Sequence, residues 1–211
     1  MLIDAKFRSG NIGTRTAALI ASAQLAATTF YPENAVIYAQ GDPAGPLYYV
    51  EFGVVRICRL TSDGRRQINS FHFAGDIFGF EVDGEHQFYA ESVNGAGVRA
   101  LRPSDDTATA GNLLALALEG LVRAKQHQLV LGRRSATEKL AGFILDMAER
   151  QGGGPLVGLP MQRNDVADYL GLTFETVSRA LRVLKDEGII RVPSIHQIEI
   201  VDQQALEDLA D

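Results

Sequence analysis

The stretch "QRNDVADYLGLTFETVSRALRVLKDEGII" (residues 162–190) decides the fold of the C-terminal part of the chain. It predicts two helices joined by a tight turn at Gly171, because glycine adopts the left-handed conformation at a helix C-terminus without a steric penalty. Thr173 is a good N-cap for the second helix, since its side-chain oxygen accepts a hydrogen bond from a free backbone N–H. That helix carries an apolar stripe at i, i+4 and i+7, formed by Val177, Leu181 and Leu184. Its opposite face is therefore expected to meet solvent.

This layout is typical of a helix-turn-helix, whose second helix enters the DNA major groove by its N-terminal residues. Three residues of the exposed face suit base reading: Glu175, Ser178 and Arg179. Arg179 can donate two hydrogen bonds to a guanine, Glu175 can accept one from a cytosine amine, and Ser178 can contact a thymine methyl or accept a base hydrogen bond. Glu175 also lies four residues before Arg179 and could hold its guanidinium in place. The alternative is a helical hairpin with a surface Glu–Arg pair.

Residues around this motif are candidates for phosphate contacts, which helix N-termini and basic side chains commonly make. The predicted set is Gln162, Arg163, Thr173, Thr176, Arg182 and His196. The following stretch, residues 188–210, predicts two short strands around Pro193-Ser194 and then an acidic helix. That strand pair is interpreted as the wing of a winged helix, where Arg191 or His196 could touch phosphate. His196 is equally well explained as an exposed loop residue.

The charge of the chain runs against this interpretation. The 211 residues carry a net charge of −6, and residues 135–211 hold seven basic and thirteen acidic side chains. Within residues 159–192, however, five basic side chains match five acidic ones. Because a DNA-binding domain normally shows a basic patch, a DNA interface here must depend on local placement of its arginines.

Residues 30–102 indicate β structure. Glycine and Asp-Gly turn signals recur about every ten residues between short runs rich in β-branched and aromatic side chains. The clearest hairpin is "VVRICRL-TSDG-RRQINSF", with its turn at Asp63-Gly64. Many short strands at even spacing predict a small barrel or jelly roll. Upstream, "AALIASAQLAATTF" (17–30) is interpreted as a packed helix in preference to a signal peptide.

After Pro103 the pattern becomes helical. The stretch "GNLLALALEGLVRAKQHQLVLGRR" (111–134) predicts one long helix with apolar residues at 4-3-4-3 spacing and a parallel seam of small residues. Such a helix between two domains favours a homodimer contact, although the β domain alone could cover it. The predicted dimerisation residues are Leu114, Ala117, Leu118, Leu121, Ala124 and Gln128. A further amphipathic helix is expected in residues 135–154.

Other classes of protein find little support. The one cysteine, Cys58, excludes an internal disulfide, a cysteine-ligated iron–sulfur cluster and a Cys₄ zinc site, and it favours a reducing cytoplasm. No run of about 18 apolar residues is present, so no membrane span is expected. The His-x-His spacing of a β-roll metal enzyme is missing as well. We therefore expect that the protein binds no metal or cofactor and is not an enzyme.

A β-roll, a long helix and a winged helix in this order resemble the CRP/FNR family of bacterial transcription regulators. The resemblance covers about residues 30–210 and is carried by "GDIFGF" (75–80), "RRSATEKLAGFILDMAER" (133–150) and "YLGLTFETVSRALRVLKDEGII" (169–190). It implies that Glu175, Ser178 and Arg179 read a TTGA-type half-site, as in the FNR branch. Phe174 stands where the cyclic-AMP receptor branch has an arginine, which also favours the FNR branch.

The resemblance further concerns what the β-roll senses. Cyclic-nucleotide binders have a Gly-Glu pair and then an Arg-Ser pair, whereas this chain has Gly79-Phe80 and then "YAES", whose Glu91 would repel a phosphate. The N-terminal cysteines of iron–sulfur members are missing, and His72 or His86 is weak evidence for a haem ligand. The chain is therefore similar to the FixK branch, whose dimers bind DNA without an effector. That branch activates microaerobic and nitrogen-fixation genes through RNA polymerase, and the acidic loop 81–85 matches a polymerase-contacting region.

Together these observations predict an α+β chain in three parts. Residues 1–109 form an N-terminal helix and a jelly-roll β-roll like those that bind cyclic nucleotides, 110–134 the dimerisation helix, and 135–211 the winged helix-turn-helix domain. The expected function is a cytoplasmic, homodimeric activator that binds double-stranded DNA at a palindromic site. A ligand-gated member of the same family, responding to haem, nitric oxide or another small molecule, is the alternative. A metal-binding β-roll enzyme is a more distant one.

Overall fold

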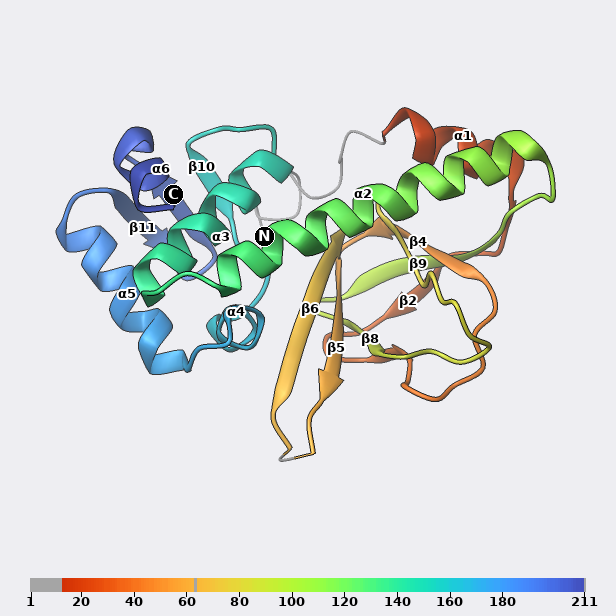
Figure 1. Cartoon of the computed structure of the whole chain (residues 1–211), viewed down its shortest axis with the longest axis horizontal. Coiled ribbons are helices and arrows are strands. Elements are labelled where there is room, and N and C mark those ends of the chain that lie inside the picture. Colours follow the sequence, from red (N-terminus) through yellow and green to blue (C-terminus); the bar gives the residue numbers. More distant parts are fainter. Residues whose placement is uncertain (1–12, 63, 211) are drawn as a thin grey trace. The chain divides into compact units, whose positions relative to one another are not determined.

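The computed structural model describes residues 13–62 and 64–210, which form two compact units (Figure 1). The first unit extends to Ala124 and the second begins at Lys125, so the division falls inside one long helix, α2 (Thr107–Leu131). Residues 1–12 of the predicted N-terminal domain lie outside the described residues. The predicted α+β fold, with its β-rich N-terminal domain, long helix and C-terminal helix-turn-helix, is confirmed.

The first unit is a β-roll of two sheets, preceded by helix α1 (Thr14–Ser22). One sheet has the order β1-β9-β4-β7 with β2 also pairing β9, and the other has the order β3-β8-β5-β6. All the strand pairs are antiparallel. The strands are β1 (Gln24–Leu25), β2 (Thr29–Tyr31), β3 (Val36–Tyr38), β4 (Leu47–Phe52), β5 (Val54–Leu60), β6 (Arg66–Phe73), β7 (Ile77–Phe78), β8 (Tyr89–Ser92) and β9 (Ala96–Arg102).

The core of the roll lies between the two sheets. Alternate residues of a strand point to opposite faces, so each strand contributes its inward set. Both sheets supply buried members of one cluster: Tyr38, Val50, Val55, Phe78, Ala90, Ala96 and Val98. A second cluster forms around Leu19 of α1, which packs with Leu101 and with the half-buried Leu113 and Leu116 of α2. The N-terminal segment is thus a packed helix, as predicted, although it ends at Ser22 and is followed by strands.

The predicted hairpin is confirmed as β5–β6, paired from Val54↔Phe73 to Leu60↔Arg66. Its turn is closed by Thr61, whose N–H donates to the Arg65 carbonyl at 2.8 Å. Gly64 has φ +80°, which glycine adopts without strain. Asp63, the other predicted turn residue, lies outside the described residues.

Helix α2 starts earlier and ends earlier than the sequence pattern predicts, at Thr107 instead of 111 and at Leu131 instead of 134. Its start is set by Asp106, whose carboxylate accepts from the Thr109 N–H at 2.8 Å. Hydrogen bonds from the Ser104 hydroxyl, then from the N–H and the hydroxyl of Thr109, lower the pKa of Asp106 to about 2. The helix stops before Ser135 because that residue takes an extended conformation, φ −107° and ψ 156°, to cap the next helix.

The second unit contains that next helix, α3 (Ala136–Arg150), followed by the predicted winged helix-turn-helix. The other elements are β10 (Leu156–Gly158), α4 (Arg163–Leu170), α5 (Phe174–Asp186), β11 (Ile190–Ser194), β12 (Gln197–Ile200) and α6 (Gln203–Ala210). Helix α3 opens with a capping box, because Ser135 accepts from the Glu138 N–H while Glu138 accepts from the Ser135 N–H. It buries Leu140, Phe143, Ile144 and Met147 against its neighbours, as the amphipathic pattern predicts.

The wing differs in detail from the prediction. Its strands do not meet at Pro193-Ser194, since β11 runs through both residues and the chain reverses at Ile195 and His196. The pairing of β11 with β12 shifts register between Arg191 and Ser194. Proline has no N–H to donate, so an irregularity in an edge strand accommodates it. Across the part of the chain that the structure describes, no helix is long and apolar enough to span a bilayer.

Candidate nucleic-acid interface

The turn between α4 and α5 has the geometry that the sequence predicts. Gly171 ends α4 in the left-handed conformation, with φ 64° and ψ 39°. The N–H of Leu172 donates back to the Ala167 carbonyl at 2.9 Å. Thr173 then caps α5, and its hydroxyl oxygen accepts from the Thr176 N–H at 3.3 Å. The direction in which α5 leaves the turn is therefore fixed by local hydrogen bonds.

The orientation of α5 about its own axis is set by burial. Its buried residues are Val177, Ala180, Leu181 and Leu184. Helices α3 and α4 cover this stripe, and both contribute buried apolar side chains to the same unit. Rotating the helix would expose these leucines, and full burial of one is worth about 1.5–3 kcal/mol. The polar face of α5 consequently points away from the core.

The predicted base-reading residues do not share one environment. Glu175 and Arg179 are exposed, whereas Ser178 is half-buried. The hydroxyl oxygen of Ser178 is buried and has no hydrogen-bond partner among the described residues. A buried hydroxyl without a partner costs free energy, so Ser178 gains from any rotation that brings it to a donor or acceptor outside the protein.

The sequence suggested that Glu175 holds the Arg179 side chain, but in the structure Thr176 does so. Its Nη2 donates to the Thr176 hydroxyl oxygen at 3.3 Å. The Thr176 hydroxyl in turn lies 3.0 Å from that of Thr173. Thr176 was predicted only as a phosphate contact, and its i, i+3 spacing to Arg179 is the sequence feature that could have revealed this role. The capping residue and the arginine are thus linked through one side chain.

Glu175 is available as a hydrogen-bond acceptor. Its pKa is lowered by its own backbone N–H, then by the Thr173 hydroxyl and by the charge of Arg179. The carboxylate is therefore ionised at neutral pH and accepts without donating. An ionised acceptor beside a guanidinium donor is the pair that a C·G base pair requires in the major groove.

The predicted phosphate contacts fall on three elements. Gln162 is the N-cap of α4 without a side-chain capping bond, and Arg163 is the first residue of that helix. Arg182 on α5 is exposed and forms an i, i+4 ion pair with Asp186 at 3.4 Å. His196 lies on the wing, where its Nδ1 is 3.1 Å from the Leu159 carbonyl and its own carbonyl accepts from the Leu159 N–H at 2.8 Å. His196 therefore anchors the wing tip.

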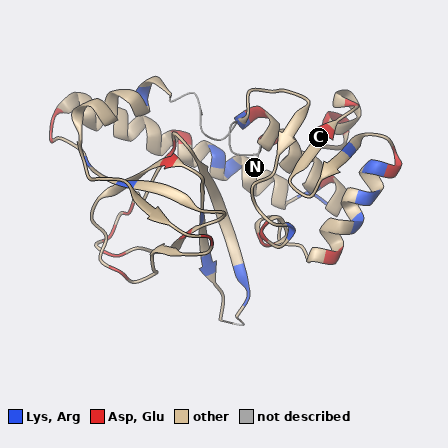
Figure 2. Ribbon diagram, turned by 180° about the vertical axis from the view of Figure 1, so that it is seen from behind, with Lys and Arg blue, Asp and Glu red and all other residues tan. Residues whose placement is uncertain are grey.

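The charges on α5 are ordered along the helix. Basic positions recur through its middle, and acidic residues mark both ends, Glu175 at the start and Asp186-Glu187 at the finish (Figure 2). Positive charge therefore lies beside the base-reading positions even though the whole unit is acidic. The basic side chains on α5 therefore give this face local positive charge, although the net charge of the chain is negative.

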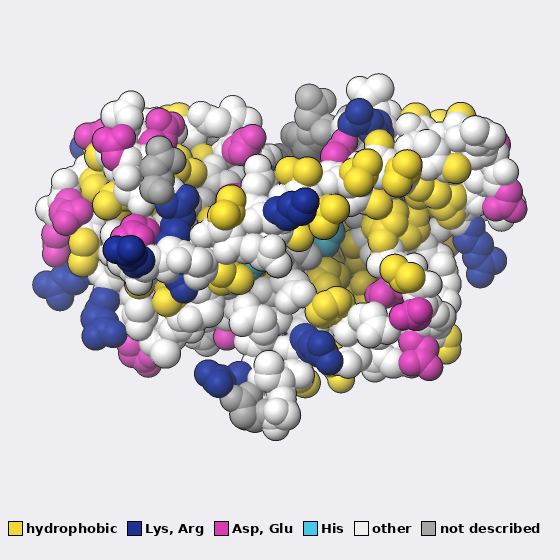
Figure 3. Space-filling view, in the orientation of Figure 1, with side chains coloured by type: hydrophobic (Ala, Val, Ile, Leu, Met, Phe, Trp, Pro, Cys, Tyr) yellow, Lys and Arg dark blue, Asp and Glu magenta, His cyan; other side chains and the backbone are white. Residues whose placement is uncertain are grey.

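All six predicted dimerisation residues on α2 are exposed. Hydrophobic side chains gather along this helix and on the neighbouring part of the roll (Figure 3). Sequence reasoning missed two further members, Val122 at 54 % exposed and Leu129 at 73 %. Leu118, Val122, Lys125 and Leu129 form a second row at 4-3-4 spacing. The predicted row, which was counted from Leu114, does not include Val122 or Leu129. Beside α2 lies an open groove of about 530 Å³, whose walls include Leu47, Phe80 and Leu114.

Aromatic side chains of the chain itself occupy the interior of the roll. Tyr38 stacks on His86 with ring centroids 3.6 Å apart, and Phe78 packs against Tyr38 at 6.1 Å. His86 is buried and its Nδ1 lies 3.2 Å from the Glu81 carboxylate. His72 lies 3.1 Å from the Ser70 hydroxyl through its Nε2. Each histidine thus has a partner within the fold through one ring nitrogen, while the buried Nε2 of His86 has no hydrogen-bond partner among the described residues.

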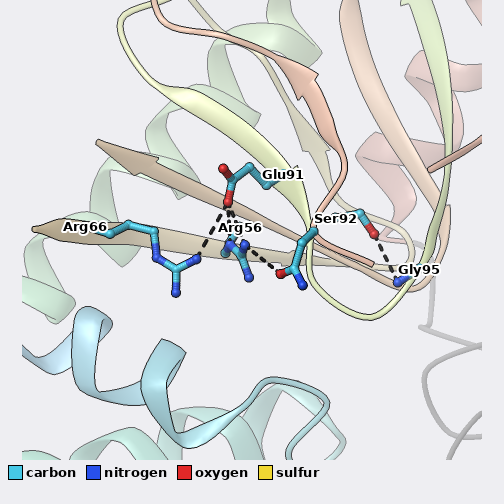
Figure 4. A network of polar contacts seen from close by, with 6 residues as sticks. Arg56, Arg66, Glu91, Ser92 and Gly95 are labelled. Carbon is cyan, nitrogen blue, oxygen red and sulfur yellow. Dashed lines mark hydrogen bonds and ion pairs between the residues drawn. The ribbon is translucent and has the colours of Figure 1, made fainter. Parts of the chain in front are cut away.

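Glu91 does not play the part that the sequence suggested. Its neighbour Ala90 points into the core, so the Glu91 carboxylate lies on the outer face of β8. There it pairs with Arg56 at 2.7 Å and with Arg66 at 3.8 Å (Figure 4). Arg56 is 4 % exposed and also donates to the Asn34 side chain at 2.9 Å. Glu91 therefore does not face the interior of the roll, where it was expected to repel a phosphate.

Metal binding finds no structural support. In residues 13–62 and 64–210, no three His, Cys, Asp or Glu side chains are grouped as a metal site would require. Cys58 is buried, and burial raises the pKa of its thiol to about 12. A thiol protonated at neutral pH is a poor nucleophile and metal ligand.

Comparison with known proteins places both parts of the chain. Residues 28–104 match the cyclic nucleotide-binding domain family and residues 138–209 match the Crp-like helix-turn-helix domain family. The nitrogen fixation regulation protein FixK of Rhizobium meliloti is 47 % identical over 179 residues, covering 85 % of each chain. The fumarate and nitrate reduction regulatory protein of Escherichia coli is 30 % identical over 187 residues, covering 82 % of this chain and 74 % of its own.

Solved structures agree with these sequence relations. FixK2 from Bradyrhizobium japonicum has a TM-score of 0.82 and 39 % sequence identity, over 88 % of this chain and 97 % of its own. A CRP-family transcriptional regulator from Thermus thermophilus has a TM-score of 0.74 at 24 % identity, over 86 % of this chain and 96 % of its own, and shows likeness of fold alone.

Proposed function

Because the chain belongs to the CRP/FNR family and is a FixK-like transcription regulator with a DNA-binding helix-turn-helix, we propose that it acts as a homodimeric activator at a palindromic TTGA-type site. One observation carries the proposal. The capped helix α5 exposes an ionised Glu175 and a positioned Arg179 within one turn of its N-terminus. These are the residues that a recognition helix uses to read bases.

Each residue has a role that follows from its chemistry. Arg179 donates two hydrogen bonds to a guanine, and Thr176 holds its side chain before DNA arrives. Glu175 accepts from the amine of the paired or adjacent cytosine. Ser178 rotates its buried, unpartnered hydroxyl towards the base edge on binding. Phosphates contact the N-termini of α4 and α5 and the basic side chains Arg163 and Arg182.

Dimerisation follows from the exposed face of α2. Leucines that are half or more exposed recur on it, and large apolar patches on a soluble chain mark interaction sites. Two α2 helices packed along this face bury Leu114, Leu118, Leu121, Val122 and Leu129. The two recognition helices of such a dimer read half-sites about one helical turn, roughly 34 Å, apart.

Effector independence is supported by the interior of the roll. The stacked Tyr38 and His86, with Phe78 beside them, occupy space that a ligand would need. We therefore propose that the dimer binds DNA without a small molecule and that its abundance determines its activity. The relatives named FixK regulate nitrogen fixation, and we propose that this chain controls genes of the same kind.

Activation requires a contact with RNA polymerase, for which the loop of residues 81–85 is the proposed surface. Val82 in this loop is fully exposed, and Asp83 and Glu85 are exposed beside it. An exposed apolar residue flanked by carboxylates is suited to a basic partner surface.

Binding-site selection on the purified, ligand-free protein tests the proposal. We expect recovery of a palindrome with TTGA-type half-sites one helical turn apart. Selection of no palindrome would overturn effector independence and favour a ligand-gated regulator. Selection of single half-sites would overturn the dimer.

A further inference from the structure

His127 lies in the last turns of α2, inside the second unit, and packs flat against Tyr169 of α4. Their ring centroids are 3.8 Å apart and their planes differ by 16°. Both ring nitrogens of His127 are buried, and neither has a hydrogen-bond partner among the described residues. A neutral imidazole always carries one N–H, so the stack keeps a donor and an acceptor unsatisfied. A hydrocarbon ring would fill the same space without that cost.

The stack belongs to a tight joint between α2 and the helix-turn-helix. A Cβ at Gly142 of α3 would lie 3.2 Å from the Val130 side chain, tighter than an ordinary contact, so α2 and α3 approach closely here. At the end of α4, Leu131 lies 4.0 Å from the position of a Cβ on Gly171, the residue that forms the turn into α5. The last turns of α2 are thereby attached to both helices that support the recognition helix.

The groups around His127 determine how it responds to protons. Tyr169 on α4 is a neutral phenol, because burial raises its pKa to about 12. Burial lowers the pKa of His127, and the charge of Asp146 on α3 opposes that effect. Asp146 is itself paired with Arg150 at 3.2 Å. The charged side chains within one turn of His127 or Tyr169 on their own helices are Arg123 and Lys125 on α2 and Asp165 and Asp168 on α4.

We propose that the His127–Tyr169 stack is a proton-sensitive joint, in which protonation of His127 releases α2 from α4 and lowers affinity for DNA. A protonated ring has two N–H groups that must reach water or an acceptor, and the stacked geometry offers neither. Leaving the stack removes one support of α4 and hence of the turn at Gly171. This inference rests on the proposed DNA-binding function and adds a means of regulating it.

The direction of the pH effect follows from linkage. The pKa of His127 is lower in the folded protein than the ordinary value of about 6.5, so the unfolded or released state binds the proton more readily. The stack is fully stabilising above about pH 6.5 and loses its contribution as the pH falls below that value towards the folded pKa. Acidification therefore opens the joint.

The test compares the wild-type protein with H127F, which keeps a flat ring but cannot be protonated. DNA affinity is measured by fluorescence anisotropy on the selected palindrome between pH 7.5 and 5.5. We expect wild-type affinity to fall by about three- to tenfold more than that of H127F, because only the wild-type side chain takes up a proton in the stack. His196 belongs to the proposed interface, so H196Q is measured as a control and should show the same pH-dependent loss of affinity as the wild type.

Two results would overturn the proposal that the His127–Tyr169 stack responds to protons. One is an identical pH profile for wild type and H127F while both bind DNA at pH 7.5. The other is a His127 pKa at or above 6.5 in an NMR titration of the wild-type imidazole signals, which needs no variant to fold. Absence of DNA binding by wild type at pH 7.5 would instead count against the proposed function itself. The two failures are thus distinguishable.

Discussion

The β-roll and the recognition helix differ in whether their charged side chains are paired within the fold or exposed to solvent. In the roll, the buried Arg56 pairs with Glu91 and Asn34, and His86 pairs with Glu81 through its Nδ1, although its buried Nε2 has no hydrogen-bond partner among the described residues. On α5, Glu175 and Arg179 face solvent, and the Ser178 hydroxyl has no hydrogen-bond partner among the described residues. Charged groups that are paired within the fold are not available to a ligand, whereas exposed charged groups can contact an external surface. Breaking one interaction in each region tests this contrast.

The largest effect is expected in the roll, from Arg56→Ala. Removing one partner of a buried ion pair costs about 3–5 kcal/mol when the remaining charge is left uncompensated. Because Glu91 is 18 % exposed and keeps Arg66 at 3.8 Å, we expect the lower end of that range. Urea unfolding followed by circular dichroism measures the change. Arg59→Ala, at an exposed position of the same strand, is the matched control and should change the free energy of unfolding by less than about 0.5 kcal/mol.

On the recognition helix, Arg179→Ala is expected to leave stability nearly unchanged and to cost roughly 1–3 kcal/mol of DNA-binding free energy at the guanine position. The loss should appear with the cognate site and vanish when that base pair is changed. Arg182→Ala, at a proposed phosphate contact, should weaken binding to all sequences alike. Equal weakening by Arg179→Ala across all sequences would contradict its role as a base reader.

A smaller effect is expected for Ser178→Ala. Unlike Arg56→Ala in the roll, it should not lower the free energy of unfolding. Removing a buried hydroxyl without a partner should leave the free energy of unfolding unchanged or raise it by up to about 1 kcal/mol. DNA affinity should fall, because the hydroxyl is lost at the base edge. Thermal unfolding and anisotropy on the same samples measure both. A clear loss of stability would mean that the hydroxyl already has a partner within the protein.

The smallest effect is expected at the start of α2. The pKa of Asp106 is lowered to about 2 in the folded protein, below its ordinary value of 3.8. Its contribution to stability is therefore present above about pH 3.8 and lost as the pH falls towards 2. Asp106→Asn keeps an acceptor for the Thr109 N–H but does not titrate. The melting temperatures of wild type and variant should converge between pH 4 and pH 2, and parallel curves would show that this cap does not titrate.

Local chemistry made the helix-turn-helix predictable. Gly171 and Thr173 are residues whose backbone and side-chain preferences agree with the turn and the cap, so their structure follows from the sequence. The β5–β6 hairpin was predictable for the same reason. Where local signals conflict with longer-range pairing, prediction failed. Pro193-Ser194 has the composition of a turn, but pairing with β12 carries the strand through it.

Side-chain direction was the part that the sequence could not supply. Placing Glu91 on the outer face of the roll requires the register of β8 against β5, in which it lies opposite Arg56. Choosing Thr176 over Glu175 as the partner of Arg179 requires rotamers, since both lie within one turn of the arginine. The start of α2 was missed because the Asp106 cap lies in a polar stretch typical of a loop.

In the proposed dimer, the exposed apolar face of α2 also makes the protein's own concentration a variable of gene control. When two chains must meet along Leu114 to Leu129 before either recognition helix finds its half-site, operator occupancy below the dimerisation constant rises with the square of the chain concentration. A tenfold increase in synthesis then raises occupancy by about a hundredfold in that range, by mass action alone. In the proposed effector-independent dimer, a strip of leucine side chains on one helix thereby makes operator occupancy rise more steeply than the chain concentration.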